Sequence, residues 1–204
     1  MYGHLHGQHD PKAAARIQSP QGLTIERNRR IRARDTACSQ KFRAGNQPRS
    51  KAPVDAVCFL PVWSPTANLI LERKKRIEFR RVPPALPPPF AAILYDPAEQ
   101  AVRAVLRIKS VLRGSPAALV ERAETLDEPR GQSKEQILGY LKTAPNPGAL
   151  VIDKIVRVGP VRLDEIRDLL PGRGVPQKFA YLPPDAPLCF IFRPALSKLG
   201  VSGF

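Results

Sequence analysis

Hydrophobic residues recur at regular spacings only in the middle of the chain, between Val54 and Pro183. Residues 1–53 contain few large apolar side chains, and those follow no sustained period. Because a folded core needs regularly spaced apolar side chains, we expect a folded domain at 54–183 and a disordered arm at 1–53. Residues 184–204 contain one apolar run, Leu188–Phe192, which fits either an extra edge strand or a packed tail.

Within the domain, the spacing predicts strands separated by a proline-rich connection. Continuous apolar runs indicate buried strands, and alternation of apolar with charged residues indicates strands with one exposed face. The predicted strands are 56–62, 76–81, 90–95, 102–111, 149–158 and 178–182. Residues 82–89 are rich in proline, so they form a rigid connection that cannot join a sheet ladder.

Helix starts are marked by side chains that cap the first turn. Ser64-Pro65 and Ser115-Pro116 each place a capping hydroxyl before a proline, and Ser133 with Gln136 forms a capping box. The predicted helices are 66–74, 115–123, 133–142 and 163–170, with Ile137, Tyr140 and Leu141 on one face of the third. Strands separated by short helices, without regular strand–helix–strand units, indicate an α+β fold. We expect a small, partly open β-barrel with short helices at its rim.

The chain carries a large positive charge, and this charge is unevenly distributed. Lys and Arg total 33 against 18 Asp and Glu, which gives a formal net charge of +15. The arm at 1–53 holds 11 basic and 3 acidic residues, a net charge of +8. Such a charge favours polyanionic partners, so we expect RNA as the first partner and DNA as the second. The arm either binds phosphates without reading sequence or is a solvated tail.

Several classes of protein are disfavoured by the sequence. No apolar run approaches the roughly 20 residues that span a bilayer, and the first residues lack the apolar core of a signal peptide. The cysteines are far apart, which argues against a disulfide framework or a zinc finger, and the histidine cluster lacks acidic or thiolate partners. The cysteines are Cys38, Cys58 and Cys189, and the histidine cluster is His4, His6 and His9. We expect a soluble cytoplasmic protein with no metal, no other cofactor and no membrane partner.

The densest charged segment of the domain, Glu72–Arg81, lies at a predicted helix-to-strand junction. Its basic residues are Arg73, Lys74, Lys75, Arg76, Arg80 and Arg81. If Lys75 and Arg80 flank a groove, they bind phosphates, and arginine also stacks on bases. The alternative is a solvated charged face. Glu78 either accepts a hydrogen bond from a base or forms an ordinary ion pair.

Three aromatic residues are candidates for stacking on bases, with core packing as the alternative for each. They are Trp63, Tyr95 and Tyr181.

The order of these segments over residues 56–183 resembles the ASCH family of the PUA-like superfamily. That family typically shows a helix that ends near Gly-x-Lys-Lys, a strand that reads Glu-x-Arg and a strand that ends in Tyr. A Ser-Pro helix start and a closing Pro-Gln-x-aromatic segment complete the pattern. The corresponding residues here are Lys74-Lys75, Glu78–Arg80, Tyr95, Ser115-Pro116 and Pro176–Phe179. Arg73 stands where the family usually has Gly, a position that favours positive φ.

The resemblance implies a β-barrel with a cleft beside the segment Lys75–Arg80, and a module that binds RNA and takes part in regulating transcription or translation. It also places Lys178 near the cleft. Some small members are amidohydrolases acting on acetylated cytidine, in which a Lys and a Thr three residues later belong to the catalytic set. Lys75 matches that lysine, but Glu78 replaces the threonine.

We therefore expect a noncatalytic nucleic-acid-binding module without catalytic residues. Its predicted binding residues are Arg73, Lys74, Lys75, Arg76, Glu78, Arg80, Arg81, Tyr95 and Lys178. The alternative is an amidohydrolase that acts on an N-acylated cytidine nucleoside, with Lys75 and Glu78 as its catalytic pair.

Overall fold

The structure is a computed structural model that describes residues 55–170 and 174–201, so the arm predicted at 1–53 lies outside the described residues. The strands are β1 (Val57–Pro61), β2 (Ile77–Arg80), β3 (Phe90–Asp96), β4 (Ala101–Arg113), β5 (Gly148–Arg162) and β6 (Ala180–Leu182). The helices are α1 (Ser64–Leu71), α2 (Pro116–Thr125), α3 (Lys134–Leu141), α4 (Leu163–Ile166) and α5 (Pro187–Ser197), and a 3-10 turn, Arg167–Leu169, follows α4.

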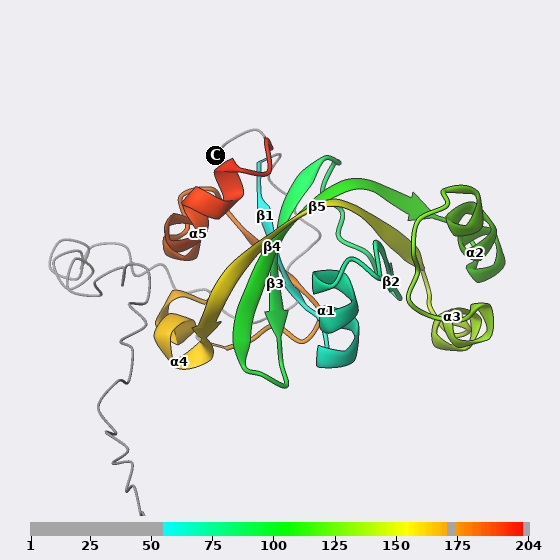
Figure 1. Ribbon diagram of the computed structural model, residues 1–204, viewed down its shortest axis with the longest axis horizontal. Coiled ribbons are helices and arrows are strands. Elements are labelled where there is room, and N and C mark those ends of the chain that lie inside the picture. Colours follow the sequence, from blue (N-terminus) through cyan, green and yellow to red (C-terminus); the bar gives the residue numbers. More distant parts are fainter. Residues whose placement is uncertain (1–54, 171–173, 202–204) are drawn as a thin grey trace, which may run out of the picture. The chain divides into compact units, whose positions relative to one another are not determined.

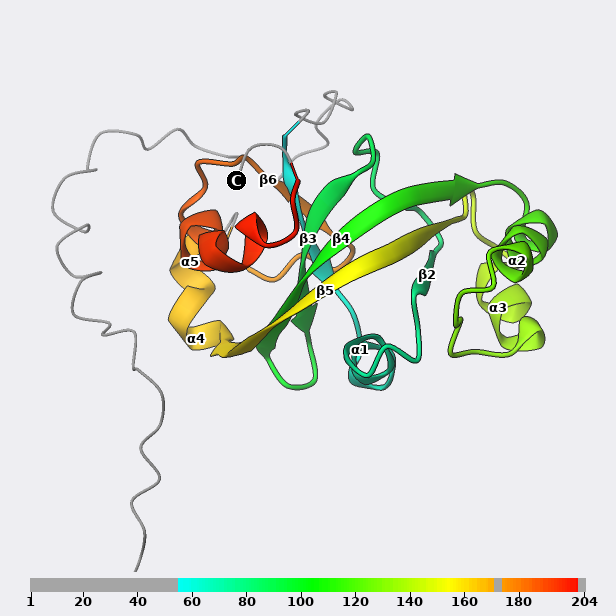
Figure 2. The same ribbon diagram turned by 45° about the horizontal axis from the view of Figure 1, so that its top comes forward.

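The six strands form one mixed sheet in the order β2-β5-β4-β3-β1-β6 (Figures 1 and 2). β1 and β3 are parallel, and the other pairs are antiparallel. The long strands β4 and β5 pair with several shifts of register, and bulges of this kind bend a sheet. Among the described residues, β2 and β6 do not pair with each other, so the barrel is partly open. The predicted α+β fold with a partly open barrel and short helices is confirmed.

Helices cover the sheet on both faces. Cys58 and Leu60 of β1 pack with α1 in one apolar cluster, whereas Val57 and Phe59 pack with α4 and α5 in another. A third cluster joins β2 to α2 and α3, which lie side by side at one end of the sheet (Figures 1 and 2). Because β1 is buried on both faces, its sequence is a continuous apolar run.

Two of the three predicted helix caps form as expected. The Ser115 hydroxyl accepts a hydrogen bond from the Ala118 N–H, and Ser133 and Gln136 form a capping box. The third prediction is wrong, because the cap residue of α1 is Trp63 and its side chain makes no capping hydrogen bond. The Ser64 hydroxyl instead donates to Asp96.

The C-terminal apolar run belongs to helix α5, so the predicted alternative of an edge strand is wrong. Leu188, Cys189, Phe192 and Leu196 are buried at a helical spacing of three or four residues, whereas a strand would bury every second residue. They pack in the same cluster as β1, β3 and β4, so the core continues beyond residue 183.

No helix within residues 55–170 and 174–201 is long and apolar enough to cross a membrane.

Candidate nucleic-acid interface

The segment between α1 and β2 begins with a backbone turn of the predicted kind. Arg73 has a φ of +60°, in the left-handed region where the sequence pattern calls for Gly. Arg73 and Lys74 are exposed, and Lys74 Nζ lies 2.9 Å from Glu72 Oε2. Arg76 is half-buried, with Nε 3.9 Å from Glu128 Oε2. These cations lie on the surface near the junction.

Lys75 and Glu78 form a buried ion pair, whereas the sequence predicts either a phosphate-binding groove or a solvated charged face for this segment. Lys75 Nζ lies 3.5 Å from Glu78 Oε2 and donates to Gln132 Oε1. Burial lowers the pKa of Lys75, and the Glu78 carboxylate partly offsets this effect. The connection between α2 and α3 covers Lys75 so closely that a Cβ on Gly131 would lie 3.0 Å from the Lys75 Cβ. Lys75 is therefore covered by residues more than fifty positions away in the sequence.

Arg80 bridges the open side of the barrel. Its NH1 donates to the Pro61 carbonyl at 3.1 Å, and its NH2 donates to the Lys178 carbonyl at 2.8 Å. Pro61 is the last residue of β1, and Lys178 lies two residues before β6. One side chain of the edge strand β2 is therefore hydrogen-bonded to the strands at the other edge of the sheet. A second bridge runs from the Ala85 N–H to the Tyr181 hydroxyl at 2.7 Å. Side chains thus connect edges that lack a backbone ladder.

A hollow of about 880 Å³ lies next to Arg80, and we call it the basic groove. It is defined by Trp63, Arg80, Arg81, Pro97, Tyr140 and Lys178. Its two aromatic side chains are unusually open: Trp63 is 69% exposed and Tyr140 is 46% exposed. All of its charged lining residues are basic, with no acidic residue from the described part of the chain.

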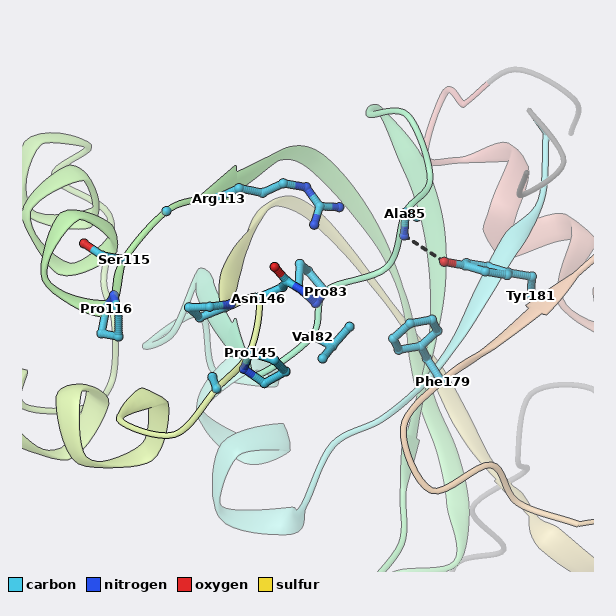
Figure 3. A pocket seen from close by; sticks show the side chains of 13 residues that line it. Val82, Pro83, Ala85, Arg113, Ser115, Pro116, Pro145, Asn146, Phe179 and Tyr181 are labelled. Carbon is cyan, nitrogen blue, oxygen red and sulfur yellow. Dashed lines mark hydrogen bonds between the residues drawn. The ribbon is translucent and has the colours of Figure 1, made fainter. Parts of the chain in front are cut away.

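A second hollow of about 850 Å³ adjoins the basic groove, and we call it the proline pocket. It is defined by Val82, Arg113, Pro145, Asn146, Phe179 and Tyr181 (Figure 3). Val82 and Pro145 line both hollows, so the two are neighbours on one surface.

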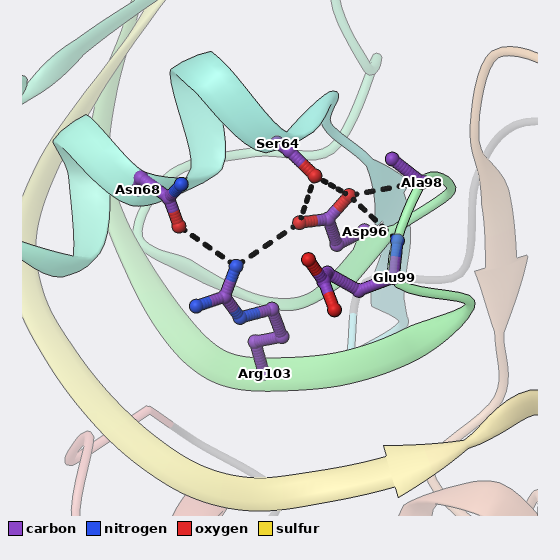
Figure 4. A network of polar contacts seen from close by, with 6 residues as sticks. All are labelled: Ser64, Asn68, Asp96, Ala98, Glu99 and Arg103. Atoms are coloured by element: carbon purple, nitrogen blue, oxygen red, sulfur yellow. Dashed lines mark hydrogen bonds and ion pairs between the residues drawn. The ribbon is translucent and has the colours of Figure 1, made fainter.

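A buried carboxylate, Asp96, is the centre of a network of polar contacts (Figure 4). Asp96 accepts hydrogen bonds from the Ser64 hydroxyl at 2.8 Å and the Ala98 N–H at 3.1 Å. Arg103 NH1 lies 3.1 Å from Asp96 Oδ2 and also donates to Asn68. The network joins the first turn of α1 to the turn after β3, and those turns adjoin Trp63 and carry Pro97. Both lining residues are therefore held in place.

The structure brings together only some of the predicted binding residues. Arg80, Arg81 and Lys178 meet in the basic groove, whereas Arg73, Lys74 and Arg76 lie outside both hollows. Tyr95 is buried and packs on Phe59 with ring centroids 5.4 Å apart, so it takes the alternative of core packing. Lys75 and Glu78 are also buried and line neither hollow.

Sequence reasoning missed Tyr140, which it placed on the core face of α3. Ile137 and Leu141 are buried there, but Tyr140 lies beside that face and opens into the basic groove. The usable signal is the position of Tyr140 around the helix axis. Tyr140 follows Ile137 by three residues and precedes Leu141 by one, which puts it at the border of the apolar stripe and not at its centre.

Comparisons with known proteins identify the fold. The sequence matches no protein-family model, and a search of curated proteins finds no match. The ASCH protein from Zymomonas mobilis has a similar structure, with a TM-score of 0.58 and 18% identity over 66% of this chain and 93% of that chain. A single-residue variant of that protein gives a TM-score of 0.59 and 18% identity over 68% and 96% of the two chains. The chain therefore has the ASCH fold, which confirms at the level of fold the resemblance seen in the sequence.

Proposed function

We propose that the protein binds single-stranded nucleic acid, with RNA as its main ligand, through the basic groove and without chemical turnover. The observation that supports this most directly is the exposure of Trp63 in a groove whose charged lining is entirely basic. A large aromatic ring that stays in solvent beside cations is typical of surfaces on which bases stack while phosphates are neutralised.

Each part of the groove has a physical role in this proposal. Trp63 and Tyr140 offer ring faces for two bases, and base stacking of this kind contributes about 1–3 kcal/mol per base. Arg81 and Lys178 are exposed and supply positive charge to the phosphates. Arg80 is committed to two carbonyls and to Glu78, so its main role is to hold the groove wall.

Hydrolysis of an N-acylated cytidine remains the competing function, and the geometry favours it less. Lys75 would have to act as a catalytic base or nucleophile, yet it is fully buried and already contacts Glu78 and Gln132. We therefore expect the purified protein to leave N-acetylcytidine intact in a chromatographic assay. Turnover that disappears in a Lys75→Gln variant would replace the binding proposal with the hydrolase.

The fluorescence of Trp63 tests the proposal directly, because it is the only tryptophan in the chain. Single-stranded RNA should quench this fluorescence, and the quenching should saturate as RNA is added. An RNA of about ten nucleotides is suitable, because this length lies within the site sizes typical of such grooves. We expect single-stranded DNA of the same sequence to bind more weakly. Tighter binding of the DNA would reverse the proposed ligand preference.

A matched pair of variants separates the groove from the rest of the chain. Trp63→Leu should lower the affinity for labelled RNA at least tenfold, since it removes one stacking platform. Phe190→Leu, which changes a comparably exposed ring on α5 outside the groove, should leave the affinity within twofold, about the scatter expected for an independent surface site. Tight RNA binding without any change in Trp63 fluorescence would place the interface elsewhere and contradict the proposal.

A further inference from the structure

We infer that the proline pocket is a second base-binding site, which holds one purine of the strand whose neighbouring nucleotide stacks on Trp63. This inference rests on the proposed function, and it adds a base preference that the basic groove alone does not provide. It is carried by two polar side chains of the pocket, Arg113 and Asn146, and by their position opposite the rings of Phe179 and Tyr181 (Figure 3).

The walls of the pocket suit a flat aromatic ligand. Phe179 and Tyr181 form a tilted pair with ring centroids 5.5 Å apart, and Val82 and Pro145 add apolar surface. Concave, mostly apolar hollows with a few polar groups are the usual form of small-ligand sites. The Tyr181 ring is fixed, because its hydroxyl accepts a hydrogen bond from the Ala85 N–H.

Arg113 and Asn146 have hydrogen-bonding capacity left for a ligand. Arg113 NH2 donates to the Pro84 carbonyl at 3.0 Å, which orients the guanidinium and leaves its other donors without a partner among the described residues. The Asn146 amide makes no hydrogen bond to any residue within 55–170 or 174–201. Figure 3 shows both groups in the central part of the pocket.

These side-chain types favour purines over pyrimidines. An arginine fork pairs with the two acceptors O6 and N7 of guanine, and an asparagine amide pairs with the acceptor and donor N7 and N6 of adenine. Arg113 is also the only charged residue that lines this pocket in the described part of the chain, so no carboxylate repels the adjoining phosphates.

The two hollows are close enough to serve one strand. Val82 and Pro145 line both hollows. In addition, Lys178 lines the groove and the next residue, Phe179, lines the pocket. A strand that crosses Val82 therefore has phosphates near the cations of the groove and a base over the pocket.

The experiment compares oligouridine of about ten nucleotides with the same strand carrying one central adenosine or guanosine. With the wild-type protein, the single purine should raise the affinity about tenfold, the usual discrimination of a bidentate contact. Asn146→Ala should abolish the gain from adenosine and Arg113→Gln the gain from guanosine, each gain being measured relative to oligouridine with the same variant. Arg193→Gln, which changes an exposed arginine of α5 outside both hollows, should preserve both gains.

The outcomes separate this inference from the proposed function. If no strand quenches Trp63, the basic groove does not bind single strands and the proposed function fails. If oligouridine quenches Trp63 but a purine adds nothing, only the second base site is overturned. An equal loss for all strands in Asn146→Ala would also overturn it, because the residue would then act without reading a base.

Discussion

At the end of α1, Arg73 adopts a backbone conformation that suits glycine better than arginine. A residue with a Cβ at this φ is strained by about 1 kcal/mol relative to Gly. We expect Arg73→Gly to raise the free energy of unfolding by about 1 kcal/mol in urea denaturation. Arg73→Ala keeps the Cβ and serves as control, so a Gly variant that is no more stable than the Ala variant would contradict this account.

The buried thiol of Cys58 predicts how stability changes with pH. Burial raises the pKa of Cys58 from 9.0 to about 12. Between these values the unfolded chain releases a proton that the folded chain keeps, so the free energy of unfolding falls as the pH rises. This thiol contributes a loss of about 1.4 kcal/mol per pH unit in that window.

Urea denaturation at several pH values above 9 should therefore show a steeper decline for the wild type than for Cys58→Ala. Below pH 8 the two proteins should differ by a constant amount, because the thiol is protonated in both states. Parallel declines above pH 9 would mean that the Cys58 thiol ionises equally in the folded protein.

Single residues also show what sequence patterns can and cannot predict. The alternation of apolar and charged residues along β2 indicates that Ile77 and Phe79 face inward, and both pack in the cluster with α2 and α3. It could not reveal that Glu78 is buried in an ion pair with Lys75, because Gly131 and Gln132, which cover Lys75, come from a distant connection. A charge pattern reports which residues share a face, but what covers that face is a tertiary property.

Among the secondary-structure elements, β2 depends on Arg80 for its connection to β1 and the start of β6. Hydrogen bonds from a charged group contribute about 1.5–3 kcal/mol each, and Arg80 also neutralises Glu78. We expect Arg80→Ala to lower the free energy of unfolding by about 3 kcal/mol. Hydrogen exchange of residues 178–182 should accelerate, while exchange in the β3–β4 pair should stay slow.

Arg81→Ala is the matched control for this prediction. Arg81 is exposed and, within the described part of the chain, donates only to Thr143, so its loss should cost less than 1 kcal/mol. If both variants lose the same stability, the bridge made by Arg80 contributes little to holding the barrel.

Helix α5 offers two phenylalanines with opposite environments. Phe192 is buried against the sheet, whereas Phe190 is 52% exposed and stacks with Arg193. Phe192→Ala should destabilise the fold by about 3–5 kcal/mol in thermal or urea unfolding, and Phe190→Ala by less than about 1 kcal/mol. Similar losses for both would mean that α5 does not pack by the face described above.

Elements with local signals were the most predictable ones. Ser115 and Ser133 cap their helices as expected because a cap involves residues within one turn. The run Leu188–Phe192 was ambiguous because five consecutive apolar residues fit both a helical and a strand period. The choice depends on the surface that receives them, here the cluster formed with β1 and β3.

For the molecule as a whole, the order of motifs predicted the fold better than it predicted the site. The open barrel was foreseen, whereas the groove was only partly foreseen: Trp63, Arg80 and Lys178 were candidates, and Tyr140 was not. The lining of the groove comes from β2, α3 and the residues before β6. Because these segments are far apart in the sequence, no pattern along the chain shows that they meet.

The salt dependence of RNA binding tests the proposed division between stacking and charge. Each neutralised phosphate of a single strand contributes about 0.7 to the slope of log affinity against log salt. The double variant Arg81→Gln/Lys178→Gln should reduce the slope by about 1.4, whereas Trp63→Leu should lower affinity with the slope unchanged. An unaltered slope in the double variant would assign the phosphate contacts to other cations of the chain.

The bridged gap in the barrel has a consequence for association between copies of this protein. A sheet with free edges invites strand addition from another molecule, the first step toward aggregates. Both edges here are short, four residues in β2 and three in β6. Each is soon followed by a pair of prolines, Pro83-Pro84 and Pro183-Pro184, which cannot donate to an intermolecular ladder. The barrel can therefore stay open without becoming a template for its own polymerisation.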